Sequence, residues 1–153
     1  MDLLIRTLTL ELATKLAAEL VTMGVDMEWE NWTPENLLSD LPGKFELSQV
    51  AMDGEAPAGY LVASLRDDLL HYHHLVISPS HRGQGIGPRL FQAAARLAQD
   101  RHGLDTARLK VHRTNPRALS LYERLGFQLV SQTGEMNTMT IPISVLLGAN
   151  GGR

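Results

Sequence analysis

Four histidines, three of them within residues 71–74, and three glycines lie within one short segment of the chain, HYHHLVISPSHRGQGIG, residues 71–87. Successive side chains of a β-strand point to opposite faces, so His71 and His73 are expected to share one face, with Tyr72 and His74 on the other. An imidazole titrates close to neutral pH, so this pair could accept a proton from a reacting group. Polar decoration of a half-exposed strand is the alternative, and for His74 it is the favoured one.

The glycines of this segment, in RGQGIGPRL, lie where an apolar strand ends and an amphipathic helix is expected to begin. Glycine permits left-handed backbone conformations, and the free N–H groups of a helix N-terminus attract anions. Arg82 could add a charged contact. The spacing of Gly83, Gly85 and Gly87 is not the dinucleotide-binding fingerprint, and no P-loop lysine follows. The segment predicts a phosphate-binding loop or, alternatively, a flexible turn and helix cap.

The composition of the chain excludes several classes of protein. It has 153 residues and no cysteine, which predicts one domain without disulfides, thiolate metal sites or cysteine nucleophiles. A net charge of −3 with interspersed signs argues against a nucleic-acid partner. We find no secretory signal and no apolar run of about 18 residues, so we expect a cytoplasmic protein without a membrane partner.

Hydrophobic periodicity predicts alternating strands and helices. Expected strands lie at 2–9, 44–52, 57–66, 69–77, 107–111, 127–133 and 136–143. Four helices are expected. The first contains Leu12, Leu16, Leu20 and Met23, and the second begins at Pro34 after a capping Thr33. The third begins near residue 86, and the fourth runs from Pro116, capped by Asn115, to Gly126. The predicted fold is α/β, a mixed, largely antiparallel central sheet of about seven strands flanked by about four helices. We expect a single domain over 1–143 and a partly disordered tail over 144–153.

Two motifs of the chain resemble those of the GCN5-related N-acetyltransferases. Arg82-x-x-Gly85-x-Gly87, preceded by LVISPSH, is similar to the pyrophosphate loop of that family, and NPRALSLYERLGF, from Asn115 to Phe127, is similar to its second signature. The resemblance implies an N-acetyltransferase that moves an acetyl group from acetyl-coenzyme A to a primary amine by direct attack. It also implies a role for each of the following cofactor-binding residues: Leu75, Val76 and Ile77 with the pantetheine arm; Arg82, Gly83, Gln84, Gly85, Ile86 and Gly87 with the pyrophosphate; and Asn115 with the cofactor.

The catalytic residues follow from what amine transfer requires. A protonated amine cannot attack a thioester, so a base must take its proton and an acid can protonate the departing thiolate. We expect His73 as the base, assisted by His71, and Tyr122, which the resemblance places near the thioester sulfur, as the acid. The histidine pattern also resembles that of the arylalkylamine acetyltransferases. Core packing is the alternative for Tyr122, and a simple N-cap for Asn115.

The chain departs from the family pattern at two positions. Pro88 lies in the first turn of the expected helix and lacks an N–H that could bind phosphate. Lys110 stands five residues before Asn115, where the ribosomal-protein alanine acetyltransferases have a glutamate base. A charged lysine cannot accept a proton, so this departure argues against that particular protein-modifying activity.

The acceptor is the least determined part of the prediction. The segment VDMEWENW combines acidic and aromatic side chains, which suits a cation, and its candidate substrate-binding residues are Glu28, Trp29, Glu30 and Trp32. A solvated loop anchored by one tryptophan is the alternative. A polyamine, an arylalkylamine, an amino acid or a peptide N-terminus all remain open as acceptors, and so does a homodimer.

Two other classes of function also remain open. A non-catalytic acyl-coenzyme A sensor would keep the phosphate-binding loop without turnover. A zinc protein could use His71 and His73 as ligands from one strand face together with a third side chain. Our prediction is an enzyme without a metal.

Overall fold

One sheet of seven strands, in the spatial order β1-β2-β3-β4-β5-β7-β6, organises the computed structural model, which describes residues 3–24 and 32–148. The strands are β1 Leu3–Thr7, β2 Gln49–Asp53, β3 Ala56–Arg66, β4 Leu69–Ile77, β5 Thr106–His112, β6 Gln128–Thr133 and β7 Met136–Pro142. The helices are α1 Leu10–Met23, α2 Pro34–Leu38, α3 Lys44–Leu47, the 3-10 turn η1 Pro79–His81, α4 Ile86–His102, α5 Pro116–Leu125 and α6 Ile143–Gly148. β4 and β5 are parallel, and the other neighbouring strands are antiparallel. The prediction of a mixed, largely antiparallel sheet is confirmed.

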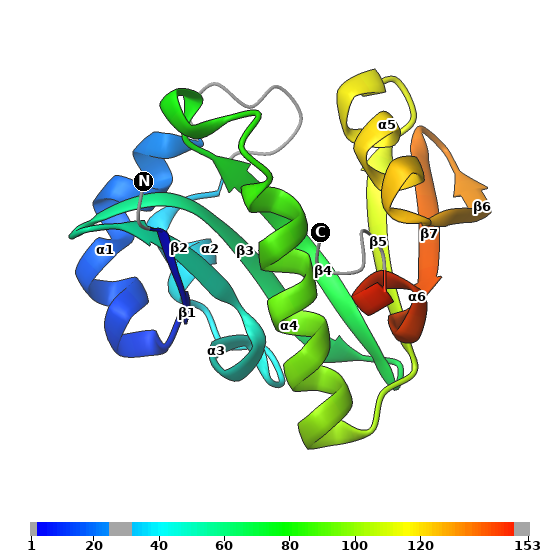
Figure 1. The fold of residues 1–153 in the computed structure, drawn as a ribbon, viewed down its shortest axis with the longest axis horizontal. Helices are drawn as coiled ribbons and strands as arrows, with labels where there is room; N and C mark the ends of the chain where they lie inside the picture. The colour runs from blue at the N-terminus through cyan, green and yellow to red at the C-terminus, as the bar shows by residue number, and fades with distance from the viewer. Residues whose placement is uncertain (1–2, 25–31, 149–153) are drawn as a thin grey trace.

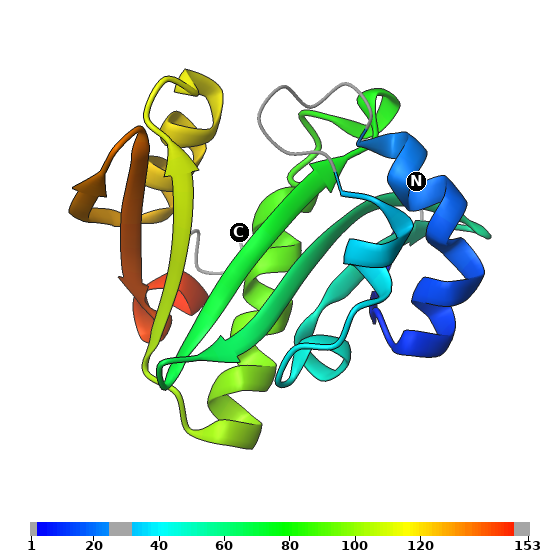
Figure 2. The same cartoon turned by 180° about the vertical axis from the view of Figure 1, so that it is seen from behind.

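Helices pack against both faces of the first four strands (Figures 1 and 2). On one face, α4 contributes Leu90 and Phe91 to the larger hydrophobic core. On the other face, α1 and α2 contribute Leu16, Leu20 and Leu37 to a second core. Three apolar side chains of β5 belong to the core beneath α4: Ala107, Leu109 and Val111. Because strand residues alternate, the remaining β5 side chains lie on the opposite face, which we call the polar face: Thr106, Arg108, Lys110 and His112.

A β-bulge at His73 interrupts β4. Val62 of β3 pairs with His74 and the next residue, Ala63, pairs with Tyr72, so His73 is an extra residue in the ladder. A bulge bends its strand and increases the local twist. The pairing of β4 with β5 ends at Tyr72, directly before the bulge. The two strands therefore run together at their beginnings and diverge toward their carboxyl ends, as Figures 1 and 2 show.

The helix ends follow the capping chemistry expected from the sequence. The Thr33 hydroxyl accepts a hydrogen bond from the Asn36 N–H at 3.1 Å at the start of α2. The Asn115 side chain accepts one from the Ala118 N–H at 3.3 Å at the start of α5, and Gly126 ends that helix with a φ of 109°. Within the described parts of the chain, no helix is both long enough and apolar enough to cross a bilayer.

Residues 44–47, predicted as the beginning of a strand, form the helix α3 instead. Gly43 precedes the helix with a φ of 71°, and the Lys44 side chain is almost fully buried. Its ammonium donates to the carbonyls of Asn36 and Ser39 at 2.9 and 2.6 Å. The lysine thus ties α3 to the end of α2, and hydrophobic periodicity carries no sign of such a contact.

The carboxyl-terminal segment predicted to be partly disordered begins with a helix. α6 spans Ile143–Gly148, and its Ile143 and Leu146 side chains are buried in the core beneath α4. Residues 144–148 are therefore helical, and the partial disorder expected of the tail stays a prediction. Residues 149–153 lie outside the described part of the chain. With α3 and α6, the described residues hold six α-helices, not about four.

Candidate active site

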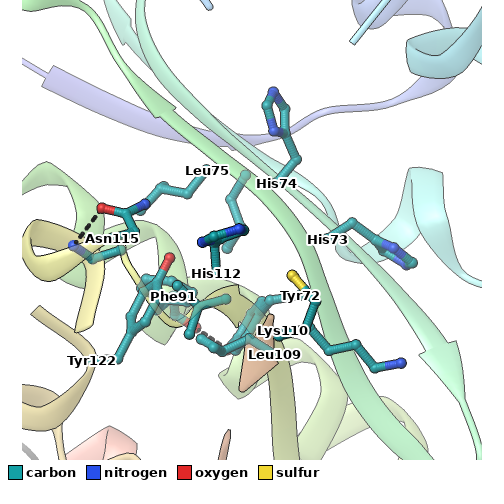
Figure 3. A pocket seen from close by; sticks show the side chains of 14 residues that line it. Tyr72, His73, His74, Leu75, Phe91, Leu109, Lys110, His112, Asn115 and Tyr122 are labelled. Carbon is teal, nitrogen blue, oxygen red and sulfur yellow. Dashed lines mark hydrogen bonds between the residues drawn. The ribbon is translucent and has the colours of Figure 1, made fainter. Parts of the chain in front are cut away.

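A cavity of about 140 Å³ lies where β4 and β5 diverge (Figure 3). Its wall includes Leu75 and Phe91, which pack in or against the core beneath α4. It also includes His73, Lys110 and His112. The divergence of the strands therefore brings side chains from both faces of the sheet to one cavity.

The glycine-rich loop forms the phosphate-binding geometry that the sequence suggests. Gly83 and Gly85 both have a φ of 77°, a left-handed conformation that L-residues with side chains rarely adopt. A Cβ at either position would meet no atom within 4 Å, so the space beside them is open. Gly85 is the N-cap of α4, a helix of 17 residues, whose first N–H groups are free to bind an anion.

Gly87 and Pro88 contribute less to this loop than the glycines before them. Gly87 has no left-handed backbone, and a Cβ there would make an ordinary contact of 3.6 Å with the Leu75 side chain. Pro88 is the third residue of α4 and supplies no N–H. The donors at the helix start are therefore the N–H groups of Ile86 and Gly87. The Arg82 Nε donates to the Ile77 carbonyl at 3.1 Å, which holds this side chain at the end of β4.

The free backbone edge of β4 faces the gap between β4 and β5. The Ser78 N–H donates to the Ala58 carbonyl of β3 at 2.8 Å. Because backbone polar groups alternate along a strand, the N–H and C=O of Val76 also point toward β3, whereas those of Leu75 and Ile77 point toward β5. No residue of β5 pairs with either of these two described residues. The N–H and C=O of Leu75 and the N–H of Ile77 are therefore placed to bind an extended ligand, whereas the Ile77 carbonyl already accepts from Arg82 and the polar groups of Val76 face β3.

The bulge brings three histidines to the polar face. Simple alternation predicted that His74 points away from His71 and His73, and this is wrong because the extra residue shifts the alternation by one. Trp32 stacks on His74 with ring centroids 5.1 Å apart and planes 9° apart. The same tryptophan lies 6.5 Å from the His73 ring. His74 is thus a buried packing partner of Trp32 next to the candidate base.

His71 is held in one neutral form by an arginine. The Arg108 Nε donates to His71 Nδ1 at 3.1 Å. A guanidinium only donates, so Nδ1 of the neutral ring carries the lone pair and Nε2 carries the proton. Burial, reinforced by the neighbouring His73 and Arg108, lowers the pKa of His71 to about 3. Its basic nitrogen is occupied, so the geometry argues against the predicted role of His71 as an assisting base.

His73 has a hydrogen-bond partner on β3 and, besides Trp32, a second ring neighbour in His71. Its Nε2 lies 2.7 Å from the Ser64 hydroxyl, and its ring packs edge-to-face on His71 at a centroid distance of 4.6 Å. Burial, followed by the cations Arg66 and Lys44, lowers the pKa of His73 to about 4. The ring is therefore neutral at neutral pH and able to accept a proton, although as a weak base. The sequence led us to expect a pKa of His73 near neutrality, whereas in the structure this pKa lies in a more acidic range.

Tyr122 and Asn115 line the cavity from the side of α5 (Figure 3). The Tyr122 ring is half-buried and packs edge-to-face against Phe91 and Phe127, at 5.8 Å from each. The Asn115 side chain is the N-cap of α5. Both residues thus have the packing or capping role that was considered as the alternative, and both also border the cavity.

The comparison with protein families decides the identity of the fold. The model of the acetyltransferase (GNAT) family matches residues 10–127. The chain belongs to this family. As a GNAT acetyltransferase it is an acyltransferase whose co-substrate is acetyl-coenzyme A. The two left-handed glycines, the open space beside them and the unpaired edge of β4 fit that co-substrate.

Individual relatives agree with the family match. This GNAT acetyltransferase is 30% identical over 112 residues to the peptidyl-lysine N-acetyltransferase YjaB of Salmonella typhimurium, covering 73% of this chain and 70% of the relative. The PaiA N-acetyltransferase of Thermoplasma acidophilum, solved with coenzyme A, superposes with a TM-score of 0.75 at 20% identity, over 93% and 99% of the two chains. The ribosomal-protein-S18-alanine N-acetyltransferase of Escherichia coli superposes with a TM-score of 0.76 at 21% identity, over 93% and 94%. The last two show the shared fold.

Among the residues that line the acetyltransferase cavity, two basic side chains of β5 were not selected as functional from the sequence, Lys110 and His112. His112 Nε2 lies 2.8 Å from a Glu135 carboxylate oxygen, and its Nδ1 lies 2.7 Å from the Thr114 hydroxyl. The two residues alternate with buried apolar residues on β5. Extending the same alternation argument from the histidine strand to this one would have placed both on the face of His73.

The predicted acceptor-binding segment lies mostly outside the described residues. Glu28, Trp29 and Glu30 are in that part, so their role as substrate-binding residues stays a prediction. Trp32 is described and lies beside His73 and His74. Over residues 3–24 and 32–148, no group of three or more histidine, cysteine, aspartate or glutamate side chains could hold a metal ion. The described chain therefore offers no third ligand for a zinc site at His71 and His73.

Proposed function

We propose that this acetyltransferase acetylates a primary amine that reaches the gap between β4 and β5 from the polar face. The observation that carries the proposal is the cavity itself, which joins the free backbone edge of β4 to His73 and Tyr122. When bound, the thioester of acetyl-coenzyme A supplies the acetyl group that the amine attacks. The chain's own residues then have three tasks: to hold the co-substrate, to take a proton from the amine and to give one to the sulfur.

The chain holds the co-substrate through backbone groups and a few side chains. The N–H and C=O of Leu75 and the N–H of Ile77 bind the amide groups of the pantetheine arm in the manner of an added strand. The N–H groups at the start of α4 and the loop from Arg82 to Gly87 bind the pyrophosphate. Asn115, next to the cavity, adds a contact from α5.

Proton removal is assigned to His73 and proton donation to Tyr122. If the Nε2–H of His73 donates to Ser64, its Nδ1 is free to accept a proton from the amine. His71, held by Arg108, packs against this ring and fixes its position. The Tyr122 phenol donates its proton to the sulfur as coenzyme A departs.

The first experiment tests the phosphate-binding loop by thermal unfolding with coenzyme A. At about 100 times its dissociation constant a ligand adds roughly 2.7 kcal/mol, which should raise Tm by about 5 to 10 °C for a chain of this size. Gly85→Ala should remove most of this shift, because the new Cβ occupies the open space beside the loop. Gly103→Ala is the matched control: it lies at the other end of α4, has a φ of 62°, and its Cβ also meets no atom.

Both substitutions carry the same left-handed strain of about 1 to 2 kcal/mol, so they should lower Tm of the free protein alike. Only Gly85→Ala should lose the coenzyme A shift, and an equal shift in the two variants contradicts the loop assignment. An acetyl-coenzyme A turnover assay over a panel of amines, including a lysine peptide because of the peptidyl-lysine relative, tests transfer. Coenzyme A binding without transfer to any amine would overturn catalysis and favour the acyl-coenzyme A sensor.

A further inference from the structure

The polar face next to His73 carries a row of polar side chains that crosses four strands. Ser64 of β3 pairs with His71 of β4, His71 pairs with Arg108 of β5, and Arg108 pairs with Thr140 of β7. These residues are neighbours along the hydrogen-bonding direction of the sheet, and their side chains share one face. Lys110 lies one step further along β5 on the same face and borders the cavity.

Positive charge dominates this part of the face. Arg108 pairs with Asp67 at 3.1 Å, but that carboxylate is largely exposed. Within residues 3–24 and 32–148, no carboxylate forms an ion pair with Arg66 or Lys110. Figure 3 shows the Lys110 side chain extending to the same side of β4 as His73. The lowered pKa values of His71 and His73 are consistent with this positive charge. Burial is the main cause for both rings, and the cations Arg66 and Arg108 lower both pKa values further.

We propose that the acceptor is a small amine that carries a carboxylate, and that Lys110, which borders the cavity, binds this carboxylate, while Arg108 and Arg66 add positive charge on the same face. The inference rests on the proposed amine transfer and adds the substrate class. Lys110, a cation without a partner carboxylate among the described residues, attracts an anionic group, and like charge disfavours a polyamine at the same place. The same cations lower the pKa of the acceptor ammonium and so favour the neutral amine that can attack.

The experiment compares kcat/KM for three kinds of acceptor of matched length. The acceptors are two ω-amino acids (β-alanine and 4-aminobutanoate), their carboxamides (β-alaninamide and 4-aminobutanamide) and the diamine 1,4-diaminobutane. The carboxylates should be preferred over the carboxamides by about tenfold or more, as expected for a charge-assisted contact, and over the diamine by more. The preference should shrink as ionic strength rises, because the cationic side chains are partly exposed.

Lys110→Met tests the assignment of the carboxylate partner. It should lower kcat/KM for the carboxylates, chiefly through KM, and bring their preference over the carboxamides down by about three- to tenfold. Lys15→Met, an exposed lysine on α1, is the matched control and should leave the preference unchanged. An equal or greater kcat/KM for the carboxamides or the diamine in the wild-type enzyme would overturn the inference while leaving amine transfer intact. Coenzyme A binding with no acceptor of any kind would instead overturn the proposed function.

Discussion

The two neighbours of β4 pair with it very differently. β3 pairs with β4 over eight residue pairs, from Gly59↔Ile77 to Arg66↔Leu69, whereas β5 pairs over three, from Leu70↔Ala107 to Tyr72↔Leu109. A long ladder satisfies the backbone and fixes the strand in the sheet. A short one leaves backbone donors and acceptors unpaired inside the protein, where a ligand can satisfy them. The long ladder therefore serves stability, and the missing part of the short ladder serves binding.

The largest effect expected from this difference concerns the two histidines at the end of the short ladder. His71 is in the paired part and is bonded to Arg108, whereas His73 is at the divergence. His73→Ala should lower the single-turnover rate by about 10²- to 10⁴-fold, as loss of a general base does. His71→Gln, which keeps an acceptor for Arg108, should lower it by less than about tenfold.

Both histidine variants should keep the Tm shift with coenzyme A, since neither side chain belongs to the phosphate-binding loop. Rapid-quench measurement of one turnover separates chemistry from product release. Equal losses in the two variants, or an unchanged rate in His73→Ala, would place the base elsewhere.

A smaller effect on rate is expected for one of two tyrosines that lie on either side of the point where β4 and β5 diverge. Tyr122→Phe keeps the ring that packs on Phe91 and removes the phenolic proton, so the single-turnover rate should fall by about 10- to 10³-fold with little loss of stability. Tyr72 is in the paired part, and its hydroxyl donates to the Phe91 carbonyl at 2.8 Å. Tyr72→Phe should lose about 1 kcal/mol of stability and keep the rate.

Urea unfolding and single-turnover kinetics on the same preparations measure both quantities for the tyrosine pair. If Tyr122→Phe turns over like the wild type, the side chain has a packing role alone.

A last effect, on stability and not on rate, is a dependence of the free energy of unfolding on pH. The pKa values of His71 and His73 are lowered from 6.5 to about 3 and about 4 in the folded protein. Between those values and 6.5 the unfolded chain binds protons that the folded protein does not, so stability rises with pH through this window and is lost as pH falls through it. Each bound proton contributes a slope of up to about 1.4 kcal/mol per pH unit.

Urea midpoints between pH 4 and pH 7 should therefore change less in a His71→Gln/His73→Gln variant than in the wild type. The comparison cancels the contribution of the carboxylates, which both proteins share. Parallel curves for the two proteins would show that the two rings titrate in the folded state as they do in the unfolded chain.

The sequence was sufficient for the features that depend on local chemistry. The strand-to-helix change at Gly85, the N-caps Thr33 and Asn115, and the hairpin around Gly134 follow from residue type and spacing, and the structure has each of them. The parallel connection from β4 through α4 to β5 also follows from the order of the elements, because a helix of this length between two strands favours a crossover.

The features that sequence reasoning missed depend on contacts between distant parts of the chain. The face of His74 is determined by the bulge, which is a property of how β4 pairs with β3 and has no signature in HYHH itself. α3, where a strand was predicted, is joined to α2 by the hydrogen bonds from Lys44 to the carbonyls of Asn36 and Ser39. The low pKa of His71 arises from burial and from Arg108, 37 residues away along the chain.

The gap between β4 and β5 depends on the one extra residue, His73, that forms the bulge between Tyr72 and His74. Without His73, the pairs Ala63↔Tyr72 and Val62↔His74 would be successive, and the ladder with β3 would be complete and regular. A straight β4 could then continue alongside β5 and cover the edge that Leu75 and Ile77 leave open. Deletion of His73 alone would thus remove the candidate base and let β5 cover the edge beside it, while every residue pair between β4 and β3 is kept. An in-frame deletion of this one codon would therefore keep the fold and remove its chemistry.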